Sequence, residues 1–240
     1  MSGHSKWTQI KRQKGVQDSK RGAVFTKLAS AITVATRQGG GDPEANFKLR
    51  VAIDKARAVN MPKDNIERAI NRGTGAGGDG NQLEEVLYEG YGPGRVAVVI
   101  KTITDNKNRT SSNLRHLLEK YGGSLGKTGT VLWQFEKRGV IRVPLNGRSA
   151  EDLEMLLIDL GAQDLIEEDG GLTVLTVPKD LQQIKEGLDK KGLEVELAEE
   201  DLRAGNLIET NTDEKNKLQA LMNELAEDPD VNDFFTNLKG

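Results

Sequence analysis

The hydrophobic periodicity of the chain changes once, at a glycine-rich segment, and this change constrains the fold more than any other feature. Before residue 73, apolar residues such as Val24, Leu28 and Ile32 recur with the spacing of one helix face. After residue 81, apolar and polar residues alternate, which is typical of strands. The segment between them, GTGAGGDGN, has five glycines and no large apolar side chain, and is typical of a linker. We therefore predict a basic arm and helical domain over residues 1–75, followed by an α/β region.

Residues 19–73 are predicted to form three helices. Gly39 to Gly41 end the first helix as a C-cap and turn. Asp42 is the expected N-cap of the second helix, with Pro43 at its first position, where the missing N–H is not needed. Pro62 is expected to open the third helix and Gly73 to close it.

The α/β region begins with two predicted strands, EVLYEGYG and RVAVVIKTIT, which are joined by a turn at GPG. A helix over about 108–120 and a strand at GTVLWQFE are expected to follow. Residues 137–205 then show the order strand, helix, strand, strand, helix, strand, which is the ferredoxin-like pattern.

The final helix, from about residue 213, and the strand over 231–235 cannot bury their apolar faces alone. We expect them to return to the first sheet, so that residues 82–136 and 206–240 form one ferredoxin-like α/β domain. Residues 137–205 would then be a second ferredoxin-like domain inserted in it. The predicted fold class is α+β.

The net charge of −3 conceals a steep gradient along the chain. Residues 1–75 contain 15 basic and 6 acidic side chains, a net charge of +9, and residues 76–148 contain 11 and 7, a net charge of +4. Residues 149–240 contain 8 basic and 24 acidic side chains, a net charge of −16. This asymmetry favours a polyanion as the partner of the N-terminal part, although two ordinary solvated surfaces would also produce it.

The basic arm is the strongest candidate for a binding site. Its cations can neutralise phosphates, and the face of Trp7 can stack on an unpaired base, which contributes about 1 to 3 kcal/mol per base. The alternative is that Trp7 folds back onto the helices as an apolar anchor while the cations stay solvated. The predicted contacts in the arm and at the start of the first helix are His4, Lys6, Trp7, Lys11, Arg12, Lys14, Lys20, Arg21 and Lys27.

The segment TDNKNRT offers a second, weaker candidate. It is predicted to place Lys107 and Arg109 near a helix N-terminus, where backbone N–H groups favour phosphate. The same residues also suit the start of a helix, with Asn108 or Thr110 as the N-cap, in an exposed loop with no ligand.

The sequence disfavours an enzyme. It has no cysteine, neither His4 nor His116 has a relay pattern, and the carboxylates have no metal-ligand spacing, so we expect no catalytic residue, metal or cofactor. Gly126, Lys127 and Thr128 resemble the end of a phosphate-binding loop, but Tyr121 stands where its first glycine belongs. The longest apolar run, VAVVI, is far below the roughly 18 residues of a spanning helix. We expect a cytoplasmic protein, most simply a monomer, with no membrane or small-molecule partner.

The N-terminal residues GHSKW, together with the later motifs NMPKDNIERAI, YEGYGPG, TDNKNRT and GTVLWQFE, resemble those of the YebC/PmpR family. The resemblance covers most of the first 136 residues. It implies a three-domain cytoplasmic protein with a helical N-terminus, two ferredoxin-like modules and no enzymatic residue. It also implies a transcriptional regulator that binds DNA.

Mitochondrial and other relatives in that family are linked to translation instead. The resemblance therefore leaves open an alternative function, in which the chain binds ribosomal RNA and assists the synthesis of proline-rich stretches. The basic arm suits both functions.

Overall fold

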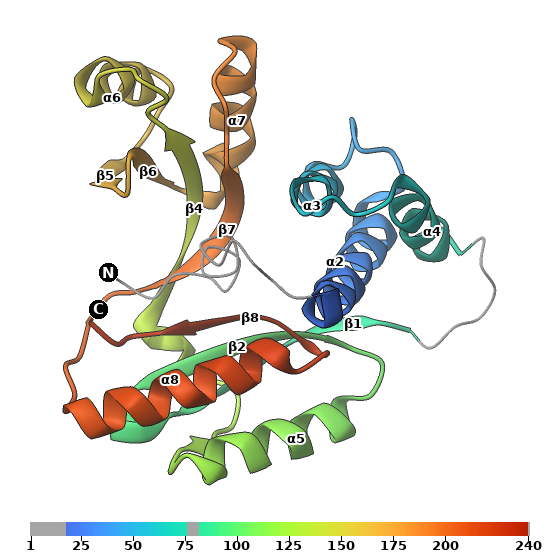
Figure 1. The fold of residues 1–240 in the computed structure, drawn as a ribbon, viewed down its shortest axis with the longest axis vertical. Coiled ribbons are helices and arrows are strands. Elements are labelled where there is room, and N and C mark those ends of the chain that lie inside the picture. Colours follow the sequence, from blue (N-terminus) through green and yellow to red (C-terminus); the bar gives the residue numbers. More distant parts are fainter. Residues whose placement is uncertain (1–17, 76–81, 240) are drawn as a thin grey trace. The chain divides into compact units, whose positions relative to one another are not determined.

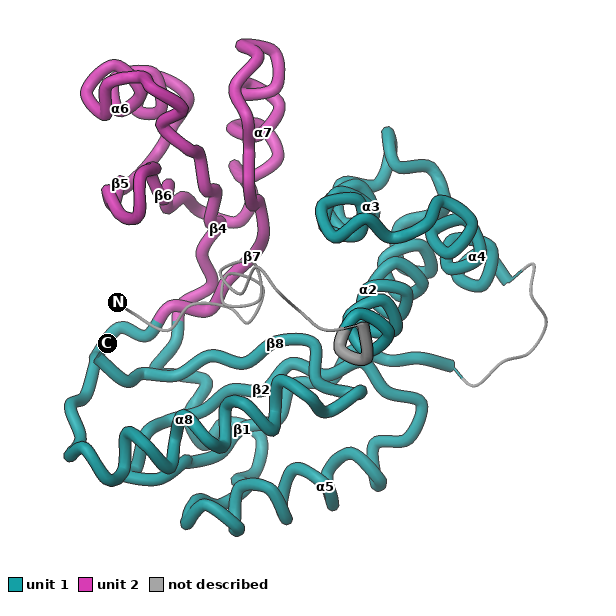
Figure 2. The backbone as a smooth tube through the Cα atoms, viewed as in Figure 1, with its two compact units in different colours: residues 1–135, 204–240 teal, residues 136–203 magenta. Residues whose placement is uncertain are grey.

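The computed structural model of the chain describes residues 18–75 and 82–239, which fall into two compact units. Unit 1 comprises residues 1–135 and 204–240, and unit 2 comprises residues 136–203 (Figure 2). Unit 2 is thus an insertion in the sequence of unit 1. The helices and the first sheet share unit 1, so the domain boundary expected between them stays a prediction.

The helical region contains the three helices expected from the periodicity (Figure 1). They are α2 (Asp18–Gly39), α3 (Phe47–Ala58) and α4 (Lys63–Gly73). Buried aliphatic side chains such as Ile32, Leu49 and Ile66 join them. Gly73 lies where α4 approaches α2, and a Cβ there would come within 2.5 Å of the Thr36 Cβ. The glycine that was expected only to end a helix therefore also permits close helix packing.

The start of α3 corrects a predicted cap. Asp42 and the proline after it lie in a turn, and Asn46 is the N-cap, with its Oδ1 accepting a hydrogen bond from Leu49 N at 3.1 Å. The Asn46 amide also donates to the carbonyls of Ala35 at 2.8 Å and Gly40 at 2.9 Å. These three bonds make the buried Asn46 the stronger cap.

Unit 1 contains an antiparallel four-stranded sheet with the order β3-β1-β2-β8. Its elements are β1 (Glu84–Tyr91), the short 3-10 turn η1 (Pro93–Arg95), β2 (Ala97–Thr104), α5 (Lys107–Lys120), β3 (Ser124–Leu125), η2 (Leu132–Gln134), α8 (Thr212–Glu227) and β8 (Val231–Thr236). As expected, the C-terminal helix and strand return to complete this sheet.

The two faces of this sheet bury different helices. On one face, α5 and α8 pack side by side over a core that includes Ile100, Leu118 and Leu221 (Figure 1). Alternation along β2 and β8 points Val99 and Phe235 to the other face, where both are buried. α2 contacts these two strands, so the sheet supports the helical region.

The predicted strand GTVLWQFE is wrong for most of its length. Residues 132–134 form η2, and only from Phe135 does the chain continue as a strand. The backbone N–H groups of Gly129, Val131 and Leu132 donate to the Glu89 carboxylate instead of to a neighbouring strand. The segment with the alternating pattern is therefore mostly a turn, which the buried Glu89 side chain stabilises.

Unit 2 is the inserted α/β module. Its elements are β4 (Phe135–Pro144), α6 (Ala150–Asp159), β5 (Asp164–Glu168), β6 (Gly171–Thr176), η3 (Pro178–Asp180), α7 (Leu181–Lys190) and β7 (Leu197–Ala204). The strand order β5-β6-β4-β7 and the two helices match the expected ferredoxin-like pattern. The whole chain is accordingly α+β, with an N-terminal helical region followed by two four-stranded antiparallel sheets.

Candidate nucleic-acid interface

Most of the predicted arm contacts lie outside the described residues. These are His4, Lys6, Trp7, Lys11, Arg12 and Lys14. Lys20 and Arg21 lie in the first turn of α2, and Arg21 is exposed. The surface that follows the arm in sequence is described for residues 18–75.

That surface is basic. Residues 18–75 contain 11 basic and 6 acidic side chains, a net charge of +5. The exposed basic residues beyond Arg21 are Arg37, Lys48, Arg57, Lys63, Arg68 and Arg72. The sequence analysis did not select these six, although the polar faces of α3 and α4 carried the signal. They extend the candidate interface from the arm over the helices.

Lys27 has a different environment from the other predicted contacts. Its side chain is buried, with 7% exposed, and its Nζ donates to the carbonyl of Ala226 at 2.8 Å. Ala226 lies in the last turn of α8, where carbonyls have no partner within the helix and the helix dipole favours a cation. Lys27 thus joins α2 to α8, and its buried side chain leaves little surface for a phosphate.

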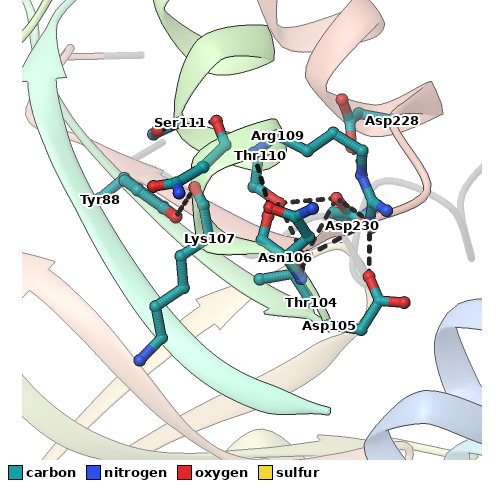
Figure 3. Close-up of polar contacts among 11 residues, drawn as sticks. Tyr88, Thr104, Asp105, Asn106, Lys107, Arg109, Thr110, Ser111, Asp228 and Asp230 are labelled. Carbon is teal, nitrogen blue, oxygen red and sulfur yellow. Dashed lines mark hydrogen bonds and ion pairs between the residues drawn. The ribbon is translucent and has the colours of Figure 1, made fainter. Parts of the chain in front are cut away.

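The segment TDNKNRT forms the junction between β2 and α5 (Figure 3). The N-cap is Asn106, whose Oδ1 accepts from Arg109 N at 3.0 Å, so the predicted caps Asn108 and Thr110 are wrong. The hydroxyl of Thr104 accepts a hydrogen bond from Asn106 N at 2.9 Å and holds the backbone of the cap residue in place. This earlier cap starts the helix at Lys107.

A carboxylate from the far end of the chain completes this junction. Asp230, just before β8, accepts from the Thr110 hydroxyl at 2.7 Å and from Arg109 Nη2 at 3.0 Å (Figure 3). Arg109 Nη2 also lies 3.0 Å from Asp105. The hydrogen bond to Asp230 is the main cause that raises the pKa of Arg109. The Arg109 charge is therefore engaged by two carboxylates.

Lys107 is engaged in a similar way. Its Nζ lies 2.6 Å from the Glu84 carboxylate, and this hydrogen bond raises the pKa of Lys107. Its backbone carbonyl accepts from the Tyr88 hydroxyl at 3.0 Å (Figure 3). Phosphate binding by Lys107 and Arg109 stays a prediction, and phosphate would have to compete with these ion pairs.

The turn at Gly126–Lys127–Thr128 already contains an anion. The buried carboxylate of Glu89 accepts from Gly129 N at 2.6 Å and from Val131 N and Leu132 N at 2.7 Å each. Burial alone would raise the pKa of Glu89, but these backbone hydrogen bonds outweigh it and lower the pKa. A phosphate-binding loop would offer such N–H groups to a nucleotide, whereas here the protein's own carboxylate occupies them.

Trp133, which follows this turn, was missed by the sequence analysis. Its side chain is 73% exposed, and its indole N–H donates to the carbonyl of Thr130 at 3.1 Å. The alternating pattern of GTVLWQFE assigned it to a strand and concealed its exposure. No group of three or more potential metal ligands occurs in residues 18–75 and 82–239. Within the same ranges, no helix is both long and apolar enough to cross a membrane.

Comparisons with known proteins agree with this architecture. A model described as the TACO1/YebC protein N-terminal domain matches residues 5–76, and one described as the TACO1/YebC second and third domain matches residues 83–238. A crystal structure of a conserved hypothetical protein, Aq1575 from Aquifex aeolicus, superposes with a TM-score of 0.85 at 42% sequence identity. The match covers 92% of this chain and 91% of that one.

Curated bacterial relatives match over the full length. Probable transcriptional regulatory protein CT1665 of Chlorobaculum tepidum is 47% identical over 239 residues, which cover 99% of this chain and 95% of the relative. Probable transcriptional regulatory protein Teth39_1009 of Thermoanaerobacter pseudethanolicus is 45% identical over 240 residues, covering 100% and 97%. With both family models and these relatives in agreement, the chain belongs to the TACO1/YebC family.

Proposed function

We propose that this protein is a non-enzymatic regulator of gene expression in the cytoplasm that binds DNA through its arm and helical region. The observation that carries the proposal is the charge contrast between the parts of the fold. Residues 1–75 have a net charge of +9, whereas unit 2, with 9 basic and 17 acidic side chains, has a net charge of −8. A polyanion is therefore attracted to the helical region and repelled by unit 2. The names of the relatives support the regulatory role.

The surface of the helical region also favours this assignment. Its exposed cations are spread over α2, α3 and α4, and two of them form ion pairs within their own helix. Arg57 lies 3.9 Å from Asp54 within α3, and Lys63 lies 3.2 Å from Glu67 within α4. Such exposed pairs contribute little stability, so a phosphate can displace them at small cost. Lys107 and Arg109 face closer carboxylates and are expected to contribute less.

The salt dependence of binding to a DNA duplex tests this proposal. Each phosphate contact releases counterions, so Lys11→Ala and Arg12→Ala should each reduce the slope of log K against log salt by about 1. Lys190→Ala is the matched control, because it removes an exposed cation from α7 of unit 2. Its slope should equal that of the wild type. Binding that does not depend on salt, or an equal effect of all three substitutions, would contradict the proposed interface.

A second candidate function is a translation factor that binds ribosomal RNA. Trp7 favours it, because an aromatic side chain among cations suits unpaired bases, which RNA loops expose. This function predicts that the protein sediments with ribosomes and that Lys6→Ala combined with Trp7→Ala abolishes the association. Crosslinking in intact cells, followed by sequencing of the bound DNA and RNA, distinguishes the two functions. Promoter fragments would support the first and ribosomal RNA the second.

A further inference from the structure

Trp133 is the most exposed large apolar side chain in the described part of the chain, at 73%. An indole ring in water loses the favourable burial that such a large side chain normally gains. Isolated exposed apolar residues need no explanation by themselves. Trp133 requires one because the protein holds this exposed ring in a fixed place.

Two linked hydrogen bonds hold the Trp133 ring in place. The Trp133 indole N–H donates to the Thr130 carbonyl at 3.1 Å, and Thr130 N donates to the Lys127 carbonyl at 3.1 Å. With its N–H engaged, the indole has no hydrogen-bond donor left, and its flat faces are what it offers to a ligand. A ligand of this ring must therefore interact by stacking.

The turn beneath the ring is held by Glu89. Its carboxylate accepts from the backbone on both sides of Thr130, at Gly129, Val131 and Leu132, and its own backbone carbonyl accepts from Gly126 N at 2.8 Å. Hydrogen bonds to a charged group are stronger than neutral ones. The turn is thus ordered before any ligand arrives, so binding loses little conformational entropy.

The composition of the turn indicates the kind of ligand. Residues 126–129 are glycine, lysine, threonine and glycine, and all four are exposed. Protein interfaces surround an exposed aromatic ring with further apolar side chains, whereas this turn supplies small residues and one cation. An exposed aromatic face that follows a turn with an exposed cation is a combination that can bind the bases and phosphates of single strands.

We propose that Trp133 stacks on an unpaired base of a single-stranded nucleic acid, with Lys127 contributing a phosphate contact. The proposal rests on the proposed function and adds to it the state of the nucleic acid, which must have a base out of the duplex at this site. It also places a second stacking residue in the protein, on the sheet-bearing part of unit 1 and outside the arm.

The chain contains two tryptophans, so Trp7→Phe leaves Trp133 as the only indole fluorophore. This variant is titrated with a single strand of about 12 nucleotides, a length within the range of known single-strand sites. The control is a strand of the same length and charge whose sugars lack bases. We expect the strand with bases to quench Trp133 fluorescence and the abasic strand to leave it unchanged.

Affinity for the same strand, measured by anisotropy of an end label, gives the second readout. Trp133→Ala should weaken binding by roughly 5- to 150-fold, which corresponds to the loss of one stacked base, and Trp133→Phe should retain most of the affinity. Ile158→Ala, which removes a 60% exposed apolar side chain from α6 of unit 2, should leave it unchanged. Because Trp133 is exposed, its removal should not unfold the protein, and circular dichroism checks this.

The outcomes separate this inference from the proposed function. Binding of the strand without quenching, with unchanged affinity of Trp133→Ala, overturns the stacking site and leaves nucleic-acid binding intact. Failure of the wild type to bind any duplex or single strand rejects both. Quenching of Trp133 by an unstructured peptide and not by the strand would assign the ring to a protein partner and overturn the proposal.

Discussion

Replacing Glu89 by glutamine removes one charge and one acceptor from the centre of the turn that carries Trp133. The wild-type carboxylate accepts from Gly129 N through Oε1, and from Val131 N and Leu132 N through Oε2. A glutamine amide has one oxygen. If that oxygen faces the two donors, its NH₂ group must face the N–H of Gly129, and two donors then oppose each other.

The magnitude follows from these three bonds. Hydrogen bonds to a charged group contribute about 1.5 to 3 kcal/mol each and neutral ones about 0.5 to 1.5 kcal/mol. The glutamine loses one charged bond and converts two others to neutral bonds, which amounts to about 5 kcal/mol in a rigid turn. Gly129 is exposed, so water can satisfy its N–H and reduce the loss. We expect Glu89→Gln to lower the free energy of unfolding by about 2 to 4 kcal/mol.

The assay is urea unfolding of the full chain in the Trp7→Phe background, followed by Trp133 fluorescence, which reports on this turn. The pH dependence gives a second test. Hydrogen bonding lowers the pKa of Glu89 below its ordinary value of 4.5, so its stabilisation is complete above that value and is lost as pH falls through the lower, folded-state pKa. The difference between the wild type and Glu89→Gln should therefore be constant near neutral pH and shrink below pH 4.5.

Glu119→Gln is the matched control, because it makes the same chemical change at an exposed position of α5 in unit 1. It should alter the free energy of unfolding by less than about 0.5 kcal/mol. A loss for Glu89→Gln as small as that of the control, or a loss that persists unchanged at pH 3, would show that the carboxylate does not hold the turn.

Three further substitutions test other parts of the structure by urea unfolding. Lys27→Met keeps the apolar stem but leaves the Ala226 carbonyl without its 2.8 Å donor, and should cost about 1 to 3 kcal/mol. Asn46→Ala removes three hydrogen bonds at a buried helix cap and should cost about 2 to 4 kcal/mol. Arg95→Gly relieves a residue held at a φ of +59° and should raise stability by about 0.5 to 1 kcal/mol, with no gain if that conformation is unstrained.

The fold was largely predictable because its signals are local. Helical spacing over 19–73, alternation after the glycine-rich segment and the unpaired final helix and strand each arise from neighbouring residues. The errors occurred where a distant residue decides the local structure. Glu89 converts the alternating segment GTVLWQFE into a turn from 40 residues away. The cap of α3 moves to Asn46 because its side chain also bonds to α2, through Ala35.

The candidate site shows the same division. Sequence identifies which residues are cationic, but it does not show which cations the fold already uses. The Lys27 ammonium bonds to a carbonyl 199 residues away, and Arg109 bonds to a carboxylate 121 residues away. Both partners lie in the returning C-terminal segment, which no local pattern connects to these cations.

A count of basic residues therefore includes cations that already have partners in the fold, at Lys27, Lys107 and Arg109. If Lys27, Lys107 and Arg109 are set aside, the exposed cations of α2, α3 and α4 remain, among them Arg57 and Lys63, whose carboxylate partners lie in the same helix. Exposed short-range pairs contribute little, whereas Lys27 and Arg109 stabilise the junctions of unit 1. Phosphate contacts concentrated on the exposed cations of the first 75 residues would then bind nucleic acid without disrupting these junctions.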